Sequence, residues 1–345
     1  MAVYTELSKP FLKELADDYG LGRVGSASGI TEGSVNSNYL LETAKGKFLL
    51  RIDEVKSENE LKREIDLLSF LRKHSFPCPH PMQDRMGRFY RNYNNKCVSL
   101  FKYQEGRLIV AEKLKPTQLE TIGHALGDLH VIGKAYKKGI DNRFSFERIA
   151  DLYLTVRTKL PNYFRKICRT LDDEIEYLTR YLEGKLPKGV IHGDIFADNL
   201  LFRGEKLTAV LDFEAACRGK FIFDIATAVN ALCFVNGEYS LDRFRFLLTG
   251  YESVRTLSLA EWDAFPNELR FSSLRFTITR LHDFFLQQGG ENVQRANKDF
   301  REFFDRLRVL RREREGGMEP LLMAMATGYD YRKYQKVKAS ERRQA

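Results

Sequence analysis

The sequence predicts an α+β protein, with a small N-terminal part of antiparallel strands around one helix and a larger, mainly helical C-terminal part. Three observations favour this fold class. Short apolar runs separated by turn residues fill the first hundred positions. Apolar residues at helical spacing dominate the rest of the 345-residue chain. One short strand-rich segment, residues 189–212, interrupts these helical patterns.

Two hairpins are predicted in the N-terminal part. The apolar runs 39–42 and 48–52 are joined by a short polar turn. The runs 88–93 and 97–103 flank two asparagines, which tolerate positive φ. Each pair of runs therefore predicts two adjacent antiparallel strands.

One helix is predicted between the two hairpins. Ser57 and Glu60 have the spacing of a capping box, and apolar residues recur at helical spacing from Leu61 to Leu71. Prolines at positions 77, 79 and 81 prevent this helix from continuing.

Three glycines near the N-terminus match a dinucleotide-binding pattern. Gly20, Gly22 and Gly25 have the spacing G-x-G-x-x-G. Such a site needs a strand before the glycines and a helix after them. Residues 11–19 instead have the pattern of a helix, and no helical pattern follows at once. We interpret the glycines as a turn into the first strand.

The C-terminal part begins near residues 101–106, where long helical patterns such as 119–132 and 171–182 take over. We expect three regions: an N-terminal lobe of residues 1–103, a C-terminal lobe of residues 104–315, and a basic extension of residues 316–345.

Composition excludes several classes of protein. With 43% apolar and 30% charged residues, the chain is globular rather than disordered. Its five cysteines are odd in number and form no C-x-x-C pair, so neither a disulfide framework nor a zinc ribbon is indicated. The first twenty residues are too charged for a signal peptide, and the most apolar stretch, residues 221–235, is too short to cross a bilayer. We expect a cytoplasmic protein that does not enter a membrane.

The net charge of +9 favours anionic partners without choosing among them. Residues 301–345 alone hold twelve Lys or Arg against seven Asp or Glu. The arginines from Arg301 to Arg314 accompany apolar residues at helical spacing, which is typical of a solvated amphipathic helix. A nucleic-acid binder would also show such a run, but we expect no nucleic-acid partner.

The strand-rich segment carries the pattern H-x-D-x-x-x-x-N at His192, Asp194 and Asn199, and Asp212 follows the next apolar run. Phosphoryl transfer needs a carboxylate that orients the attacking hydroxyl or accepts its proton. It also needs hard oxygen ligands that hold magnesium against the nucleotide phosphates. Taken singly, the aspartates could be turn residues and the histidine a core residue. Their joint spacing favours a kinase.

These motifs resemble those of the aminoglycoside phosphotransferase-like small-molecule kinases, which share the bilobal protein-kinase fold. The similarity covers roughly residues 1–310 and is greatest to bacterial homoserine kinases of that fold. The segments that carry it are residues 1–5, 29–38, 77–79, 189–199, 250–255 and 274–283.

The resemblance implies an enzyme that uses ATP and Mg²⁺. It implies that Asp194 is the catalytic base, that His192 braces the catalytic loop, and that Asn199 and Asp212 hold the metal ion. It also implies that Asp224 ties this loop to the following helix, although a simple helix-capping role would explain that residue as well.

The expected acceptor is a small hydroxylated molecule, L-homoserine by resemblance. Choline, an aminoglycoside, methylthioribose or another amino alcohol are the alternatives within the same class. An inactive nucleotide-binding scaffold is the alternative of a different class, although the complete set of Asp194, Asn199 and Asp212 argues against it. The sequence leaves the oligomeric state open.

The nucleotide phosphates are expected to bind in the N-terminal lobe. Arg51 would reach them from its strand as a permanent cation, where protein kinases use a lysine. Glu64 lies on or beside the apolar face of the predicted helix and would pair with Arg51. Gly33, Ser34 and Asn36 belong to a loop that would cover the phosphates.

Adenine is expected near Phe101 and Tyr103, between the two lobes, although both could be ordinary core residues. The chain lacks a full glycine-rich loop and has Glu214 where protein kinases have a glycine. These departures disfavour a protein substrate.

The acceptor residues are less defined. Homoserine presents an ammonium, a carboxylate and a hydroxyl, so its site needs an anion donor and an acidic or amide group. Arg280 and Asp283 lie three residues apart on one predicted helix and could clamp such a zwitterion, or could pair with each other or with water. The further candidates are Glu32, Asp198 and Glu214.

Overall fold

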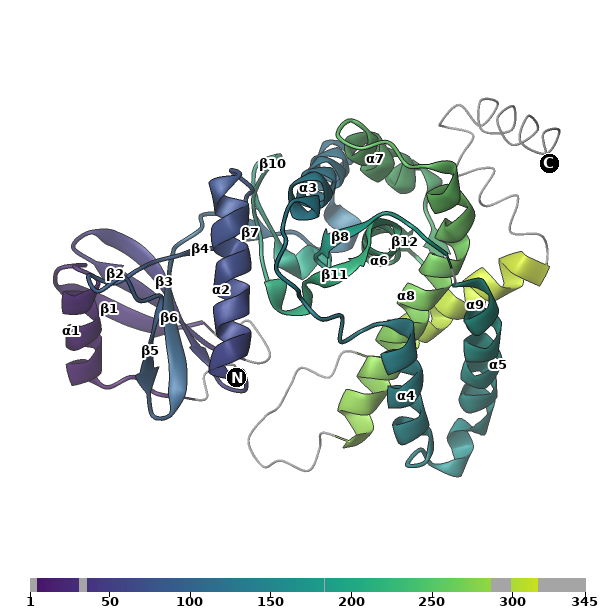
Figure 1. Ribbon diagram of the computed structural model, residues 1–345, viewed down its shortest axis with the longest axis horizontal. Helices are drawn as coiled ribbons and strands as arrows, with labels where there is room; N and C mark the ends of the chain where they lie inside the picture. Colours follow the sequence, from purple (N-terminus) through teal and green to yellow (C-terminus); the bar gives the residue numbers. More distant parts are fainter. Residues whose placement is uncertain (1–4, 31–35, 183, 287–298, 316–345) are drawn as a thin grey trace. The chain divides into compact units, whose positions relative to one another are not determined.

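The computed structural model describes residues 5–30, 36–182, 184–286 and 299–315 (Figure 1). The chain divides into two compact units. The first holds the described residues up to Arg107 together with Thr208–Glu214, and the second holds the remaining described residues. Thr208–Glu214 comes from within the predicted C-terminal lobe, and the predicted extension, residues 316–345, lies outside the described residues.

An antiparallel sheet forms the centre of the first unit, as the sequence predicts. The strand order is β1-β2-β3-β6-β4, and β5 also pairs with β6. Both predicted hairpins are present, and the two asparagines between β5 and β6 have positive φ. The strands are β1 (Val24–Gly29), β2 (Ser37–Thr43), β3 (Gly46–Asp53), β4 (His80–Pro81), β5 (Tyr90–Tyr93) and β6 (Lys96–Lys102).

The sheet of the first unit lies between two helices, α1 (Lys9–Asp18) and α2 (Glu58–Lys73) (Figure 1). The predicted capping box is present, because the Ser57 side chain accepts from the Glu60 N–H and the Glu60 carboxylate accepts from the Ser57 N–H. The apolar side of α1 packs on one face of the sheet, over Leu41, Leu50 and Leu100. The opposite face carries α2.

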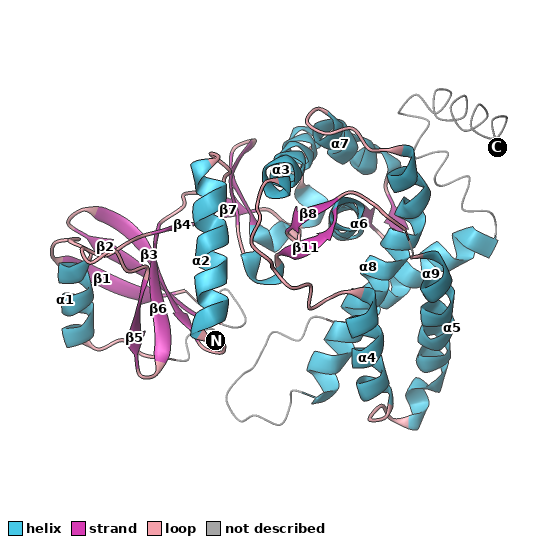
Figure 2. Ribbon diagram, in the orientation of Figure 1, coloured by secondary structure: helices cyan, strands magenta, loops and turns pink. Residues whose placement is uncertain are grey.

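The second unit is mainly helical, with short strands among the helices (Figure 2). Its helices are α3 (Pro116–Lys134), α4 (Phe146–Arg157), α5 (Arg165–Tyr181), α6 (Phe221–Leu232), α7 (Leu241–Glu252), α8 (Leu259–Leu286) and α9 (Arg301–Glu315). The strands of the remaining chain are β7 (Arg107–Leu108), β8 (Lys188–Ile191), β9 (Leu200–Arg203), β10 (Lys206–Val210), β11 (Cys217–Lys220), β12 (Phe234–Val235) and β13 (Glu238–Tyr239). Short 3₁₀ helices occur at Ala111–Lys113, Asn162–Phe164, Ala197–Asn199 and Phe213–Ala215.

Glycines let α3 and α7 approach closely. A Cβ at Gly123 of α3 would collide with the backbone oxygen of Leu247 in α7. A Cβ at Gly250 of α7 would collide with the backbone oxygen of Glu120 in α3. The helices therefore pack backbone to backbone, which fixes the side chains that α7 directs at α3.

The arginine-rich run forms α9 and packs on the second unit. Leu307 and Leu310 are fully buried, as the amphipathic interpretation requires. Arg306 Nε donates to the backbone oxygen of Asn230 at 2.9 Å, and Arg311 Nη1 donates to that of Thr170 at 2.6 Å. These arginines satisfy carbonyl groups of the chain itself. Within the described residues, no helix has the length and apolar character that crossing a membrane requires.

Candidate active site

The second unit brings His192, Asp194 and Asn199 together in the loop between β8 and β9. Asn199 Nδ2 donates to the backbone oxygen of Asp194 at 2.8 Å and to its Oδ2 at 3.2 Å. The backbone N–H of Asp194 donates to Nδ1 of His192 at 3.2 Å. These contacts fix the orientation of the Asp194 carboxylate relative to the loop that carries it.

Asp224 anchors this loop from α6. Its two carboxylate oxygens each accept a backbone N–H, from His192 and from Gly193, both at 2.7 Å. Asp224 is fully buried. Burial acts to raise its pKa, but hydrogen bonds from His130 and from the His192 N–H outweigh burial, so the pKa lies below its ordinary value. The ionised carboxylate therefore ties the loop to α6, as the resemblance implied.

His130 extends the network to α3, a role that the sequence analysis did not assign. Its Nε2 lies 3.2 Å from Asp224 Oδ2, and its Nδ1 lies 2.8 Å from the hydroxyl of Tyr251. Arg255 Nη1 donates to that same hydroxyl at 2.8 Å. Burial lowers the pKa of His130, which keeps the ring neutral. A histidine inside the apolar pattern of residues 119–132 was the available signal, but a core histidine gives the same pattern.

Two further features shape the loop. Gly193 has a φ of +74°, and a Cβ there would lie 3.1 Å from the backbone oxygen of Ala215. The Gly193 carbonyl accepts from Nη1 of Arg275, a side chain of α8 that is only 3% exposed. The guanidinium of Arg275 is stacked against Phe144 and Phe276, with its carbon 4.0 and 4.2 Å from the ring centres.

Arg275 also compensates the charge of the loop between β8 and β9. Burial lowers its pKa to about 10, and the Asp194 carboxylate is the largest influence in the opposite direction. The guanidinium remains charged at neutral pH. Arg275 was not predicted from the sequence, where an arginine inside the apolar run of residues 274–281 was the available signal.

The side chain of Asn199 suits a hard cation. Asn199 makes both of its hydrogen bonds to Asp194 through Nδ2, so the amide plane turns Oδ1 away from Asp194. Amide and carboxylate oxygens are the ligands that Mg²⁺ prefers. The other predicted ligand, Asp212, belongs to the first unit, where it has a φ of +57° and its Oδ1 accepts from the Glu214 N–H at 3.3 Å.

In the first unit, Arg51 and Glu64 form the predicted ion pair. Arg51 Nη1 and Nη2 donate to the two oxygens of Glu64 at 2.8 and 3.0 Å. Burial acts to raise the pKa of Glu64, but Arg51 and Lys56 outweigh burial and lower it to about 2. Phe101 is 2% exposed and its ring centre lies 5.0 Å from the Arg51 guanidinium carbon, so it supports the pair from the sheet.

Lys56 is a second cation in this cluster, and sequence reasoning missed it. Its Nζ lies 2.6 Å from Glu64 Oε2 and 2.7 Å from Glu214 Oε1. Glu214 Oε1 also accepts from Asn36 Nδ2 at 2.7 Å. Asn36 and Glu214, predicted for different roles, therefore meet in the first unit. No sequence spacing links Lys56 to Glu214, because they are far apart in the chain.

The structure gives less information on the other predicted nucleotide and acceptor residues. Glu32, Gly33 and Ser34 lie outside the described residues. Tyr103 is 37% exposed. Asp198 is exposed, in the catalytic loop.

Arg280 and Asp283 of α8, which were predicted as a pair, contact different partners. Arg280 Nη1 donates to Glu302 Oε2 at 2.8 Å and to the backbone oxygen of Asp299 at 2.7 Å. Asp283 Oδ1 lies 3.2 Å from Nδ1 of His282. Arg280 is therefore engaged with the region before and within α9.

Comparison with known proteins places these features in a family. The model of the phosphotransferase enzyme family (APH) matches residues 26–257. The proteins named homoserine kinase of Methylobacillus flagellatus and Parvibaculum lavamentivorans are 35% and 34% identical to the chain. The first match covers 84% of this chain and 90% of the relative, and the second covers 90% and 96%.

Solved structures share the fold at low identity. Amicoumacin kinase, solved with AMP-PNP and Ca²⁺, superposes with a TM-score of 0.67 at 16% identity, covering 89% of this chain and 93% of that one. Spectinomycin phosphotransferase superposes with a TM-score of 0.64 at 13% identity, covering 88% and 98%. At these identities the likeness concerns the fold alone.

Proposed function

Because the chain belongs to the phosphotransferase enzyme family, we propose that it transfers the γ-phosphoryl group of ATP to the side-chain hydroxyl of L-homoserine. The products are O-phospho-L-homoserine, an intermediate of threonine biosynthesis, and ADP. The observation that carries the proposal is the fixed geometry of Asp194 and Asn199 in a loop anchored by buried Asp224. The identity to relatives named homoserine kinase supports the acceptor.

Asp194 acts on the acceptor hydroxyl. Its carboxylate orients the hydroxyl toward the phosphoryl group and takes its proton as the new P–O bond forms. Asn199 holds Asp194 in place, and His192 braces the loop through the Asp194 N–H. Arg275 offsets the negative charge of the loop without contacting the Asp194 carboxylate directly.

Asn199 and Asp212 would hold Mg²⁺, which when bound neutralises charge on the phosphates of ATP.

In the first unit, Arg51 is held by Glu64 and presents a permanent cation to the nucleotide. Asn36, with Gly33 and Ser34, would cover the phosphates. Phe101 and Tyr103 would lie near adenine. The use of ATP fits a reaction in the cytoplasm.

The acceptor amino group and carboxylate need their own partners. Asp198 follows Asp194 in the same loop and is exposed, so it is a candidate for the ammonium. Arg280 is a candidate for the carboxylate if it exchanges its contact with Glu302. Glu32, Glu214 and Asp283 are the other candidates.

An ADP-release assay over a panel of acceptors tests the proposal. The panel contains L-homoserine, choline, an aminoglycoside, methylthioribose and a simple amino alcohol. We expect the highest kcat/KM with L-homoserine. Turnover of another acceptor with none on homoserine would refute the acceptor assignment.

The variant Asp194→Asn tests the base in the same assay. We expect kcat to fall by about a hundred- to ten-thousandfold, with ATP binding retained, because the carboxylate acts on the hydroxyl and not on the nucleotide. Asp151→Asn, at an exposed position of α4, is the matched control and should behave as wild type. Wild-type activity in Asp194→Asn would exclude this residue as the base.

A further inference from the structure

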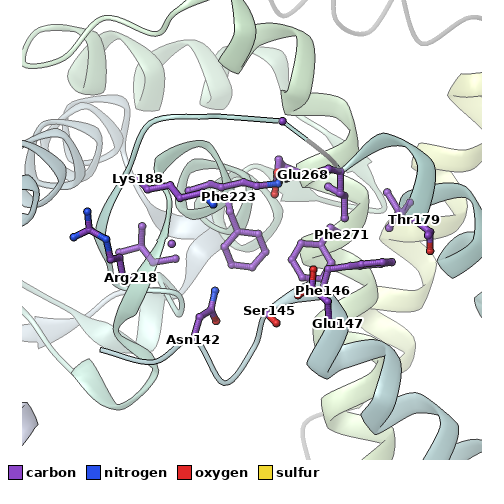
Figure 3. A pocket seen from close by; sticks show the side chains of 16 residues that line it. Asn142, Ser145, Phe146, Glu147, Thr179, Lys188, Arg218, Phe223, Glu268 and Phe271 are labelled. Atoms are coloured by element: carbon purple, nitrogen blue, oxygen red, sulfur yellow. Dashed lines mark hydrogen bonds and ion pairs between the residues drawn. The ribbon is translucent and has the colours of Figure 1, made fainter. Parts of the chain in front are cut away.

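A cavity lies within the second unit, outside the loop that carries Asp194. Its volume is about 300 Å³, and its walls come from α4, α5, α6, α8, β8 and β11 (Figure 3). His192, Asp194 and Asn199 do not line it. A volume at the lower end of the range for small-molecule sites suits a ligand smaller than a nucleotide.

The cavity contains a buried carboxylate with one oxygen unused. Glu268 is 1% exposed, and its Oε1 accepts from Lys220 Nζ at 2.8 Å. Its Oε2 is buried and has no hydrogen-bond partner within the part of the chain that the structure describes. Lys220 is committed elsewhere as well, because it donates to the backbone oxygen of Leu182 at 2.8 Å. A buried acceptor without a donor costs free energy, which a cationic N–H group of a ligand would recover.

Burial raises the pKa of Glu268, and Lys220 only partly opposes this effect. A second cation at Oε2 would stabilise the ionised carboxylate further. Among the described residues, Lys220 is the only cation in contact with Glu268, and Lys188 acts on it at longer range.

The middle of the cavity is apolar and aromatic. In Figure 3 the rings of Phe223 and Phe271 lie between Glu268 and the loop that carries Asn142 and Ser145. The two ring centres are 5.1 Å apart. Such rings pack against a short carbon skeleton, and their faces attract an ammonium group.

The lining of the cavity also holds two exposed cations. Lys188 and Arg218 line it from β8 and β11, and both are exposed. Lys188 lies directly opposite Lys220 in the antiparallel pair. Like charges placed opposite each other are unfavourable, and a bound anionic group would relieve them. Glu147 also lines the cavity, and it is an exposed acidic residue.

We propose that this cavity is a second binding site, for a small amino acid in its zwitterionic form. The ammonium donates to Glu268 Oε2, the carbon skeleton packs on Phe223 and Phe271, and the carboxylate faces Lys188 and Arg218. The buried carboxylate of Glu268 and the exposed cations Lys188 and Arg218 are complementary to the two charges of the ligand. The site does not depend on the transfer reaction.

Calorimetric titration of the full chain with the common L-amino acids and L-homoserine tests this proposal. Each ligand is compared with its N-acetyl derivative, which lacks the ammonium. We expect at least one amino acid to bind and its N-acetyl derivative to bind at least about tenfold more weakly. The absence of binding by every amino acid at millimolar concentration would overturn the proposal.

Variants separate this cavity from the acceptor site. Glu268→Gln keeps the shape of the side chain and should weaken binding by about tenfold or more. Lys188→Ala changes an exposed residue, so it remains informative if Glu268→Gln does not fold, and it should also weaken binding. Lys137→Ala, exposed and outside the cavity, should bind as wild type does. Binding that is unchanged in Lys188→Ala and in folded Glu268→Gln would place the ligand elsewhere and refute the site.

Discussion

Glu64 shows how single residues set the charge state of the cluster that it forms with Arg51 and Lys56. The carboxylate is buried, and burial alone would favour its neutral form. Two cations, Arg51 and Lys56, contact its two oxygens and reverse that preference. Nearby Asp53 has only longer contacts with these cations, 3.4 and 3.5 Å, and burial raises its pKa. The two cations therefore stabilise the ionised form of Glu64 more than that of Asp53.

The ionised state of Glu64 should appear as a pH dependence of stability. Its folded pKa, about 2, lies below the ordinary value of 4.5, so the contribution is fully present above pH 4.5 and is lost as the pH falls toward 2. In Glu64→Gln this contribution is absent. We expect the stability advantage of wild type over the variant to shrink by about 2 kcal/mol between about pH 6 and pH 3.

Urea unfolding followed by circular dichroism at several pH values measures this difference. Glu14→Gln, at an exposed position of α1, is the control and should follow the wild-type pH dependence. A constant difference between wild type and Glu64→Gln across the range would contradict the low pKa of Glu64.

Arg275 and His130 show why part of the site was not predictable. The H-x-D-x-x-x-x-N pattern is local, so its spacing alone predicts that three side chains meet. Arg51 and Glu64 are 13 positions apart, and strand alternation and helix phase predict their pairing. His130 is 94 positions from Asp224, and Arg275 is 82 from Gly193. Only the packing of α3, α6 and α8 around the loop brings these residues together.

At the scale of elements, the packing of α3 on α7 supports the catalytic loop. Gly123 and Gly250 allow the two backbones to meet, and Tyr251, the next residue of α7, reaches His130 of α3. His130 in turn contacts Asp224, which holds the loop. Residues 250–255, one of the segments on which the sequence resemblance was based, therefore help to hold the loop between β8 and β9 through Tyr251 and Arg255.

Gly250→Ala should destabilise the second unit. The new methyl group would meet the Glu120 backbone, which cannot move without shifting α3. We expect a loss of about 1–3 kcal/mol in the free energy of unfolding, the usual range for overpacking. Gly139→Ala is the matched control, because nothing lies within 4 Å of the position of its Cβ. Equal stability of the two variants, measured by urea unfolding, would mean that the helices separate at little cost.

At the scale of the whole molecule, the net charge was a poor guide to the ligand. The resemblance and the hairpin and helix patterns predicted the kinase-like fold correctly. The charge did not identify a partner, because Arg306 and Arg311 of the arginine-rich run bind carbonyl groups of the chain itself. A helical pattern shows which face is apolar, but it does not show which carbonyl groups of other helices remain to be satisfied.

The two units have separate hydrophobic cores, which has a consequence for unfolding. The core of the first unit gathers around α1 and its sheet and includes fully buried Leu50. A core of the second unit gathers around α4, α5 and α8. The single tryptophan of the chain, Trp262, lies in α8, so its fluorescence reports on the second unit, whereas circular dichroism reports on both.

We therefore expect Leu50→Ala to lower the urea midpoint seen by circular dichroism and to leave the midpoint seen by Trp262 fluorescence unchanged. Truncating a buried leucine lowers the free energy of unfolding by about 2–5 kcal/mol, and here it would lower that of the first unit. Gly250→Ala should instead shift the fluorescence midpoint. Independent cores allow this behaviour only if the units unfold in separate transitions. If Leu50→Ala moves both midpoints equally, the chain unfolds as one cooperative unit, and the separation of its cores carries no thermodynamic meaning.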